Sequence, residues 1–296
     1  MVRIAPVDRG DLDEATAVLA QSCAFDRAAE VAEEKLFGPA PAGPPLTLGA
    51  WDGRALVGVA AVASDRVRVL AVAPAARRHG VGTALLEACA GAARAAGAVK
   101  LRTLDQPGNY LAPGIDERNT ESIGWLERRG WRRHLEVRSN VLIDVRDNPR
   151  VSVSRAAGLA AAAAARGYEV RRARPDEPGL LDAVATEFGG AWPFELARAL
   201  AFDPPGVHLA RRDDAYCAFA AHDGNNRGLG WFGPTGTWPA HRGVGLGEAL
   251  LVACLVDVAE RHAHCEVAWI GPRAFYDKVA GIAGDRRFVV LARNLG

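Results

Sequence analysis

The chain contains the same eleven-residue pattern twice, and this repeat constrains its fold more than any other feature. The first copy runs from Val72 to Gly82 and the second from Thr237 to Gly247, with the Pro, one Ala, the Arg and two glycines in register. Each copy follows an apolar, strand-like run and opens a helical pattern, which begins with Thr83-Ala-Leu-Leu in the first case and Glu248-Ala-Leu-Leu in the second. The repeat therefore predicts two copies of one strand-loop-helix unit.

The residues of this pattern favour the binding of an anion. An Arg followed by two glycines at the first turn of a helix leaves backbone N–H groups uncovered, where the helix dipole favours negative charge. Glycine lets a phosphate approach the backbone, and Arg77 and Arg242 can each add a charge-assisted contact. A tight turn alone would explain one glycine pair, but two pairs in the same context favour a nucleotide phosphate.

Several segments carry a family resemblance. Arg-x-x-Gly-x-Gly between a strand and a long apolar helix resembles the acetyl-CoA signature of the GCN5-related N-acetyltransferase (GNAT) superfamily, and both halves contain it. Segments 119–131 and 274–281 are similar to the family's helix and turn after its fifth strand. Segments 109–114 and 231–236 resemble tandem bacterial members, some of which act on amino sugars.

The resemblance implies that each half binds acetyl-CoA. The residues implied to contact it are Leu70, Val72, Arg77, Arg78, Gly80, Val81, Gly82 and Thr83 in the first half and Thr235, Thr237, Arg242, Gly243, Gly245, Leu246, Gly247 and Glu248 in the second. The implied fold is α+β (α/β), with two tandem acetyltransferase-type domains that each have a central mixed, mostly antiparallel sheet flanked by helices.

The length of 296 residues suits two cores better than one. The predicted division is an N-terminal domain over residues 1–147, a linker over 148–166 and a C-terminal domain over 167–296. Asp147-Asn148-Pro149 stops the preceding strand, and the alanines of the linker favour a helix.

Composition excludes several classes of function. With 36 basic and 35 acidic residues, the chain has no general attraction for nucleic acid or for an anionic membrane. It shows no signal pattern and no long apolar run, so we expect a cytoplasmic protein, as a monomer or homodimer. Five sparse cysteines argue against a disulfide framework. His262, His264 and Cys265 lack a further ligand at zinc-type spacing, so no metal is expected.

Acetyl transfer to an amine needs a deprotonated amine, a donor to the thioester carbonyl and a proton for the departing thiolate. The resemblance places Tyr276 at the thiolate, although a core role for this aromatic residue is an alternative. Leu126 holds the matching place in the first half, which would have to use Tyr110 or do no chemistry. Backbone N–H groups at the ends of strands 67–72 and 230–237 can polarise the carbonyl.

The candidates for the general base are Glu266 and Glu187, with Asp105 as the counterpart in the first domain; most such carboxylates are only solvated, and a chain of waters could serve instead. Aromatic residues that could line the pocket for the acceptor amine are Trp192, Phe194 and Trp231, and each of these could instead belong to the core.

The sequence is therefore interpreted as an acetyl-CoA-dependent N-acetyltransferase whose C-terminal domain is catalytic and whose N-terminal domain only binds the cofactor. The expected acceptor is a small primary amine, with an amino sugar as the leading candidate. In one alternative both domains act on other amines such as polyamines, amino acids or aminoglycosides. In another the protein is a non-catalytic acyl-CoA-binding scaffold.

Overall fold

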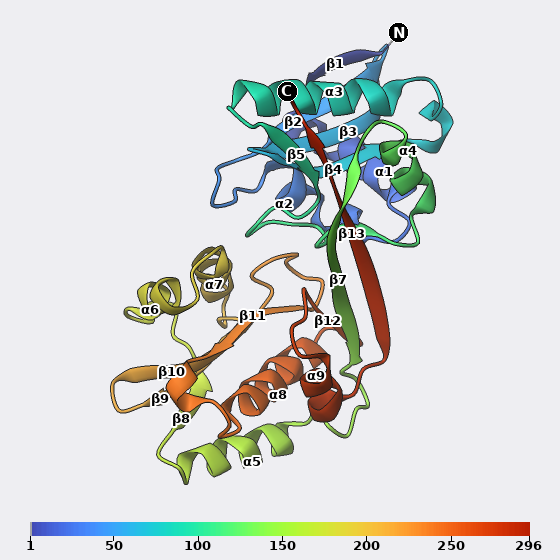
Figure 1. Ribbon diagram of the computed structural model, residues 1–296. Coiled ribbons are helices and arrows are strands. Elements are labelled where there is room, and N and C mark those ends of the chain that lie inside the picture. The colour runs from blue at the N-terminus through green and yellow to red at the C-terminus, as the bar shows by residue number, and fades with distance from the viewer. Residues whose placement is uncertain (1) are drawn as a thin grey trace. The chain divides into compact units, whose positions relative to one another are not determined.

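A computed structural model describes residues 2–296, which form two compact units (Figure 1). Unit 1 comprises the chain up to Arg138 together with Arg287–Gly296, and unit 2 comprises Ser139–Arg286. The predicted N-terminal domain began at residue 1, and Met1 lies outside the described residues. Each unit is described by itself below.

Unit 1 has a six-stranded sheet in the order β1-β2-β3-β4-β5-β13, with the short β6 pairing to β13. Neighbouring strands are antiparallel except β4 and β5, which are parallel. The strands are β1 (Arg3–Pro6), β2 (Leu46–Asp52), β3 (Ala55–Ala63), β4 (Arg66–Val72), β5 (Lys100–Thr103), β6 (Ile115–Asp116), the first part of β7 (Arg132–Asp144) and the last part of β13 (Gly284–Asn294). The helices are α1 (Leu12–Ser22), α2 (Ala32–Phe37), α3 (Val81–Ala95) and α4 (Thr120–Glu127).

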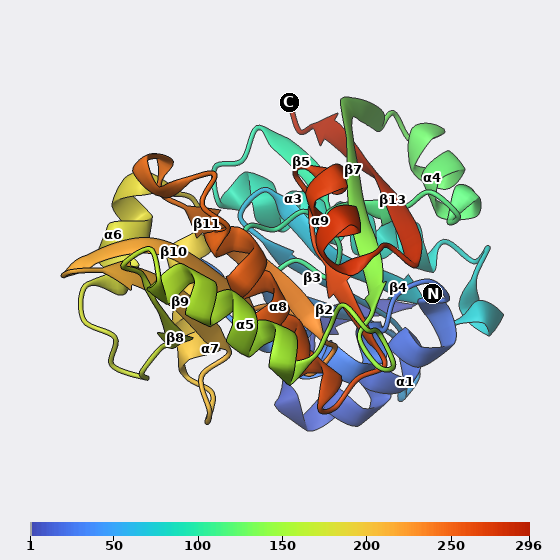
Figure 2. The ribbon, with the colours of Figure 1, turned by 90° about the horizontal axis from the view of Figure 1, so that it is seen from below.

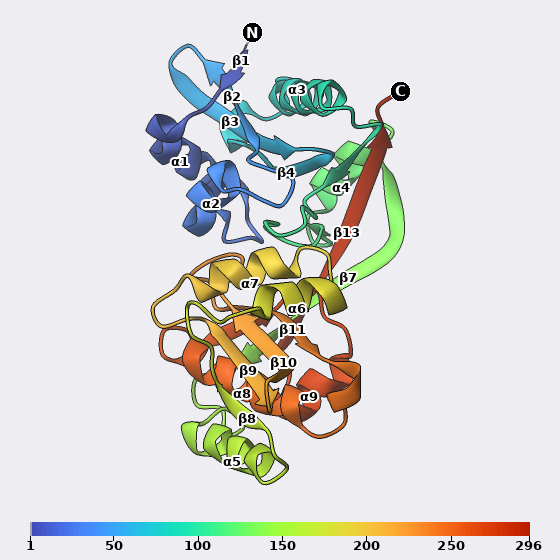
Figure 3. The same cartoon turned by 90° about the vertical axis from the view of Figure 1, so that its left-hand side faces the viewer.

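The helices of unit 1 cover both faces of this sheet. Figure 3 shows α3 on one side of β2–β4 and α1 with α2 on the other. Successive strand residues point to opposite faces, so Ala60 and Val62 of β3 pack with Leu85 and Leu86 of α3. This arrangement holds α3, and the loop that precedes it, firmly against the end of β4.

Unit 2 repeats the plan with the order β7-β12-β11-β10-β9-β8, in which only β11 and β12 are parallel neighbours. Its strands, besides the last part of β7, are β8 (Glu169–Arg172), β9 (Val207–Arg212), β10 (Ala215–His222), β11 (Trp231–Thr237) and β12 (His264–Val267). Its helices are α5 (Val153–Ala164), α6 (Leu180–Glu187), α7 (Trp192–Leu200), α8 (Leu246–Ala259) and α9 (Arg273–Ala280). Both units thus confirm the predicted mixed, mostly antiparallel sheets flanked by helices.

Alternation along β10 builds the two layers of the unit 2 core. Ala218 and Ala220 pack in the cluster that contains α8 and α9, whereas Phe219 and Ala221 pack in the cluster that contains α6 and α7. Figure 2 shows α5 lying along α8 on the first of these sides. The predicted linker is therefore a helix, and it is part of the unit 2 core.

The observed boundaries differ from the predicted ones at both closing strands. Residues 141–144 of β7 pair with β12 of unit 2, and residues 292–294 of β13 pair with β5 of unit 1. The predicted domains 1–147 and 167–296 assigned each closing strand to the half that precedes it in sequence. A strand pattern specifies that a segment is extended but not its partner, which is set by long-range packing.

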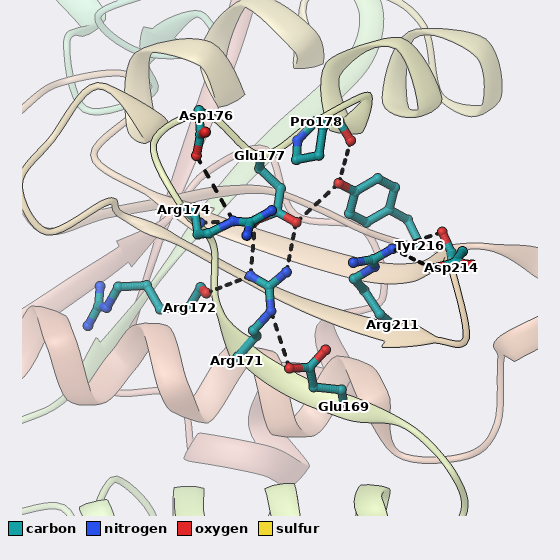
Figure 4. Close-up of polar contacts among 10 residues, drawn as sticks. All are labelled: Glu169, Arg171, Arg172, Arg174, Asp176, Glu177, Pro178, Arg211, Asp214 and Tyr216. Carbon is teal, nitrogen blue, oxygen red and sulfur yellow. Dashed lines mark hydrogen bonds and ion pairs between the residues drawn. The ribbon is translucent and has the colours of Figure 1, made fainter.

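A buried ion pair fixes the loop between β8 and α6 in unit 2 (Figure 4). Glu177 accepts hydrogen bonds from Arg171 at 2.8 and 3.0 Å and from the Tyr216 hydroxyl at 3.1 Å. The Arg171 guanidinium holds the pKa of the Glu177 carboxyl down at about 2, so the pair stays ionised through the physiological range. The pair ties the start of α6 to the β8–β10 part of the sheet.

Candidate active site

The two copies of the repeated pattern have the same backbone geometry. Gly80 and Gly245, with φ of 82° and 90°, precede α3 and α8 at the N-cap position, and in neither helix does the N-cap side chain cap the first turn. Arg77 Nε donates to the Val72 carbonyl at 3.1 Å, and Arg242 Nε donates to the Thr237 carbonyl at 3.1 Å. Each loop therefore presents uncapped N–H groups at a helix start, as the sequence predicted.

The second glycine of each pair lies under an aromatic ring. A Cβ atom at Gly82 would lie 3.5 Å from the ring of Trp125 in α4, and one at Gly247 would lie 3.5 Å from the ring of Phe275 in α9. Trp125 thus corresponds to Phe275. The next residues, Leu126 and Tyr276, correspond as the sequence comparison proposed.

The central strands separate just before each loop. β4 and β5 pair at Arg66↔Arg102 and Val67↔Thr103, and β11 and β12 pair at Trp231↔Glu266 and Phe232↔Val267. Past these positions the facing edges of β4 and β11 are open. The Val72 carbonyl accepts hydrogen bonds from Ser22 and Arg77 on the open side of β4. Because backbone groups alternate between the two edges of a strand, the N–H and C=O groups of both Leu70 and Val72 point to this open side. By the same alternation Thr235 and Thr237 face the open side of β11.

In unit 1 this open edge borders a cavity of about 780 Å³. Its polar end includes the glycine loop and Thr83. Ser22, at the end of α1, also lines the cavity and donates a hydrogen bond to the Val72 carbonyl at 3.0 Å. Its inner end is apolar; the residues there are Val67, Val69, Leu86, Leu104, Leu111, Ile115 and Leu126. The residues of 242–248 line neither this cavity nor the smaller one of about 370 Å³ in the described chain.

Charges at the cavity favour an anion. The arginines that line it are Arg77, Arg78, Arg118, Arg128 and Arg129, and the carboxylates are Asp26 and Glu121. Arg78 pairs with Glu121 at 3.0 Å on the surface. Burial and the nearby Asp26 raise the pKa of the Cys23 thiol to about 12, so this thiol in the cavity wall stays protonated.

In unit 2, aromatic rings pack where unit 1 has part of its cavity. Phe188 follows α6 as Cys23 follows α1, and its ring lies so close to β11 that a Cβ at Gly236 would meet it at 2.8 Å. The ring stacks on Trp192 with centroids 5.3 Å apart and meets Trp238 edge-on at 5.0 Å. These rings belong to the core cluster between the sheet and α6–α7.

Each glycine loop and the first turn of the helix after it are called a seat below. The two seats also differ at the third residue of the helix. Thr83 in α3 accepts a hydrogen bond from Arg129 of the segment after α4, at 3.2 Å. Glu248, at the corresponding place in α8, accepts from Arg155 of α5 at 2.7 Å. Arg155 also donates to the Val279 carbonyl of α9, as Arg129 donates to the Trp125 carbonyl of α4. The second seat thus contains a carboxylate already paired with an arginine.

Comparison with known proteins identifies one family domain in the chain. The family model of the acetyltransferase (GNAT) domain matches residues 46–133, which include the first loop. This segment of unit 1 is therefore assigned to a GNAT domain. No protein among the curated sequences compared matches this chain.

Solved structures extend the GNAT fold to the whole chain as a tandem pair. The chain resembles the glucosamine N-acetyltransferase region of a fungal multi-domain GH3 β-N-acetylglucosaminidase, with a TM-score of 0.76 and 18% identity; the match covers 99% of this chain but 38% of that protein. It also resembles a tandem GNAT protein from the clavulanic acid biosynthesis pathway, with a TM-score of 0.70, 20% identity and coverage of 100% and 99%. A GCN5-related N-acetyltransferase from Sphaerobacter thermophilus has a TM-score of 0.67, 17% identity and coverage of 99% and 96%.

Tyr276 lies in the interior of unit 2. It is 5% exposed and contacts the rings of Phe232 and Phe275 at centroid distances of 6.4 and 5.1 Å. Burial raises the pKa of its phenol to about 12, so the hydroxyl is neutral and could donate a proton. Leu126 is equally buried in unit 1 and has no proton to donate.

The three candidate bases lie in different surroundings. Glu266 of β12 accepts a hydrogen bond from Asn140 of β7 at 2.6 Å and pairs with Arg286 of β13 at 3.0 Å. These two contacts hold its carboxylate between the strands. Glu187 is exposed at the end of α6. The strand pairing of the two units places Arg102, opposite Arg66, at the position that Glu266 holds opposite Trp231. Arg102 rather than Asp105 therefore corresponds to Glu266.

Asp105 lies deeper in unit 1. Its carboxylate is 2% exposed and forms ion pairs with Arg66, Arg102 and Arg138. A carboxylate held by three arginines serves to balance buried charge.

The aromatic acceptor candidates belong to the packing of unit 2. Trp192 packs in the aromatic cluster, Trp231 is 3% exposed, and Phe194 is half-buried under the guanidinium of Arg198 at 6.0 Å. Tyr110 is buried and is not among the residues that line the unit 1 cavity.

Sequence reasoning missed Ser22, Asp26, Arg129 and Arg155. Ser22 and Asp26 carried no signal, because nothing local shows that the end of α1 returns to β4. Arg129 could have been found, since it lies inside segment 119–131, which the resemblance had already assigned to the helix and turn after the family's fifth strand. Arg155 was hidden in the alanine-rich linker.

Other sequence inferences concern cysteines, metals and membranes. All five cysteines are free thiols; Cys89, Cys217, Cys254 and Cys265 are buried, and Cys23 is partly exposed. Among residues 2–296, no cluster of three or more His, Cys, Asp or Glu could hold a metal, and His264 pairs with Asp144 at 2.8 Å. No helix of the described chain is both long and apolar enough to cross a bilayer.

Proposed function

We propose that this protein is an acetyl-CoA-dependent N-acetyltransferase, that the donor binds in the unit 1 cavity, and that the acceptor is a small primary amine. One observation carries the proposal. The loop of Arg77–Thr83 opens into a cavity of about 780 Å³ that runs along an unpaired strand edge.

The residues present fit coenzyme A. The uncapped N–H groups at the start of α3 and the nearby arginines would hold the diphosphate. The outward backbone groups of Leu70 and the outward N–H of Val72 would pair with the amides of the pantetheine arm, as a peptide adds to a sheet edge. The Val72 carbonyl already accepts from Ser22 and Arg77. The apolar inner end would take the acyl group.

Acetyl-CoA, when bound, supplies a thioester whose carbonyl carbon is the electrophile. At the inner end, backbone N–H groups near the bulge of β4 at Arg68 would polarise the carbonyl oxygen. Asp26 is the cavity carboxylate next to Cys23, and it would attract the acceptor's ammonium group and take its proton. Leu126 donates no proton, so the thiolate would be protonated by solvent.

For the acceptor we propose an amino sugar. This rests on the resemblance of segments 109–114 and 231–236 to tandem bacterial members, some of which act on amino sugars, and on the likeness to a glucosamine N-acetyltransferase region. The single negative charge of Asp26 suits the single ammonium group of a small amine. Such an acceptor does not require a large charged surface on the protein.

A second candidate places the chemistry in unit 2. The observation that favours it is Tyr276, a neutral phenol at the position that corresponds to Leu126. Under that alternative unit 1 binds the cofactor without turning it over.

The test is a thiol-release assay with acetyl-CoA and a panel of amines: glucosamine, polyamines, amino acids and aminoglycosides. We expect release above background with glucosamine or a related sugar. Release only with polyamines or amino acids would remove the amino sugar and keep acetyl transfer. No release with any amine, in protein that binds coenzyme A, would favour the scaffold alternative.

A further inference from the structure

The second glycine loop has the backbone of an anion seat but a different charge inside it. Gly245 and Arg242 reproduce the geometry of Gly80 and Arg77. The first turn of α3 contains no acidic residue, whereas the first turn of α8 contains Glu248. The difference between the seats therefore lies in side chains and not in the fold.

Glu248 is the third residue of α8, the position that Thr83 holds in α3. Thr83, its counterpart, lines the unit 1 cavity beside Gly82. A carboxylate at that position is favoured by the uncapped N–H groups and the dipole of α8, which are the same features that would favour a phosphate. It also neutralises the charge of a neighbouring guanidinium, because Arg155 is paired with Glu248 at 2.7 Å.

Arg155 is held in place by more than this ion pair. Its guanidinium also donates to the Val279 carbonyl at 2.7 Å and to the Arg150 carbonyl, so it joins α5, α8 and α9. Both partners of the pair are about one-third exposed or less. The pair is thus part of the packing between helices, and a diphosphate would have to displace it while facing a like charge.

We infer that Glu248 closes the second coenzyme seat by acting as an internal substitute for a phosphate, so that the protein binds coenzyme A in unit 1 alone. This inference rests on the proposed function only for the identity of the ligand. It replaces the expectation of one cofactor in each half.

The inference is tested by exchanging the two residues. We expect titration calorimetry with coenzyme A to give one site per chain in the wild type, two in Glu248→Thr and none in Thr83→Glu. The double variant Thr83→Glu/Glu248→Thr should again bind one, now with hydrogen-exchange protection at 244–249 instead of 80–83. Circular dichroism and thermal unfolding check that each variant is folded.

The outcomes separate this inference from the proposed function. One site in both wild type and Glu248→Thr, or two sites in the wild type, would overturn the role of Glu248 while coenzyme A binding stands. No site in the wild type but one in Glu248→Thr would contradict the donor site of unit 1 and support the closure by Glu248. No site in any folded variant would overturn both.

Discussion

Unit 1 and unit 2 share a fold and a loop geometry but differ in what fills the space beside the loop. In unit 1 the open edge of β4 borders a cavity of about 780 Å³, and the seat contains Thr83. In unit 2, Phe188 and its aromatic neighbours pack against β11, and the seat contains Glu248. The difference teaches that a binding motif specifies backbone geometry, while a few side chains decide whether a ligand can enter.

The largest expected effect comes from placing a carboxylate in the first seat. Gly82→Glu should weaken coenzyme A binding by at least about a hundredfold, because the new side chain meets the diphosphate with a like charge and blocks backbone approach. The matched control is Gly247→Glu, which should leave the affinity unchanged. Calorimetry of both variants checks this, and a loss caused by Gly247→Glu instead would reverse the assignment of the two units.

The aromatic cluster of unit 2 should matter for stability and not for acceptor binding. Trp192→Ala should lower the free energy of unfolding by about 2–4 kcal/mol, as for other large-to-small changes at packed sites. Trp192→Phe, which keeps a ring against Phe188, should cost much less. Chemical denaturation measures the loss. A several-fold rise in the acceptor's Michaelis constant with unchanged stability would return Trp192 to the acceptor site.

A buried charge cluster makes the stability of unit 2 depend on pH. Burial alone would lower the pKa of His222, but hydrogen bonds with Asp223 and Asp257 raise it to about 8. Asp257 also pairs with His208 and Arg172. A raised pKa stabilises the fold fully below the unfolded value of about 6.5, and this contribution is lost as the pH rises through about 8.

We therefore expect β9 and β10 to lose about 1–2 kcal/mol of protection between pH 6 and 9, judged from the size of the shift. Hydrogen exchange, corrected for the intrinsic pH dependence of the rates, measures this. His222→Gln should flatten the profile. An equal loss in β2 and β3 of unit 1 would show that the effect is not local to this cluster.

The smallest effect is expected at Tyr276. If the donor binds in unit 1, Tyr276→Phe should change turnover by less than about twofold, since the ring keeps its contacts with Phe232 and Phe275. A loss of tenfold or more, within the usual range for a general acid, with coenzyme A affinity unchanged, would assign the chemistry to unit 2.

Local features were predictable from the sequence because they depend on local patterns. The helices that the repeat predicted after the two glycine pairs are α3 at Val81–Ala95 and α8 at Leu246–Ala259. The glycines that start both helices were identified from the repeat. The alanine-rich linker was correctly expected to be helical, as α5 shows.

Features that depend on long-range packing were not predictable in the same way. No local pattern shows that β13 pairs with β5, or that Phe188 packs on Gly236. The acidic Glu248 was readable in the sequence, yet it was grouped with the phosphate contacts because its backbone position matched. Its meaning became clear only from its ion pair with Arg155.

Hydrogen exchange of the wild-type protein with and without coenzyme A tests the central claim most directly. The account predicts slower exchange at 77–83 and at α4 in the presence of the ligand, and unchanged exchange at 242–248. Slower exchange at 242–248 with none at 77–83 would contradict it, because the donor would then bind beside the seat that Glu248 occupies.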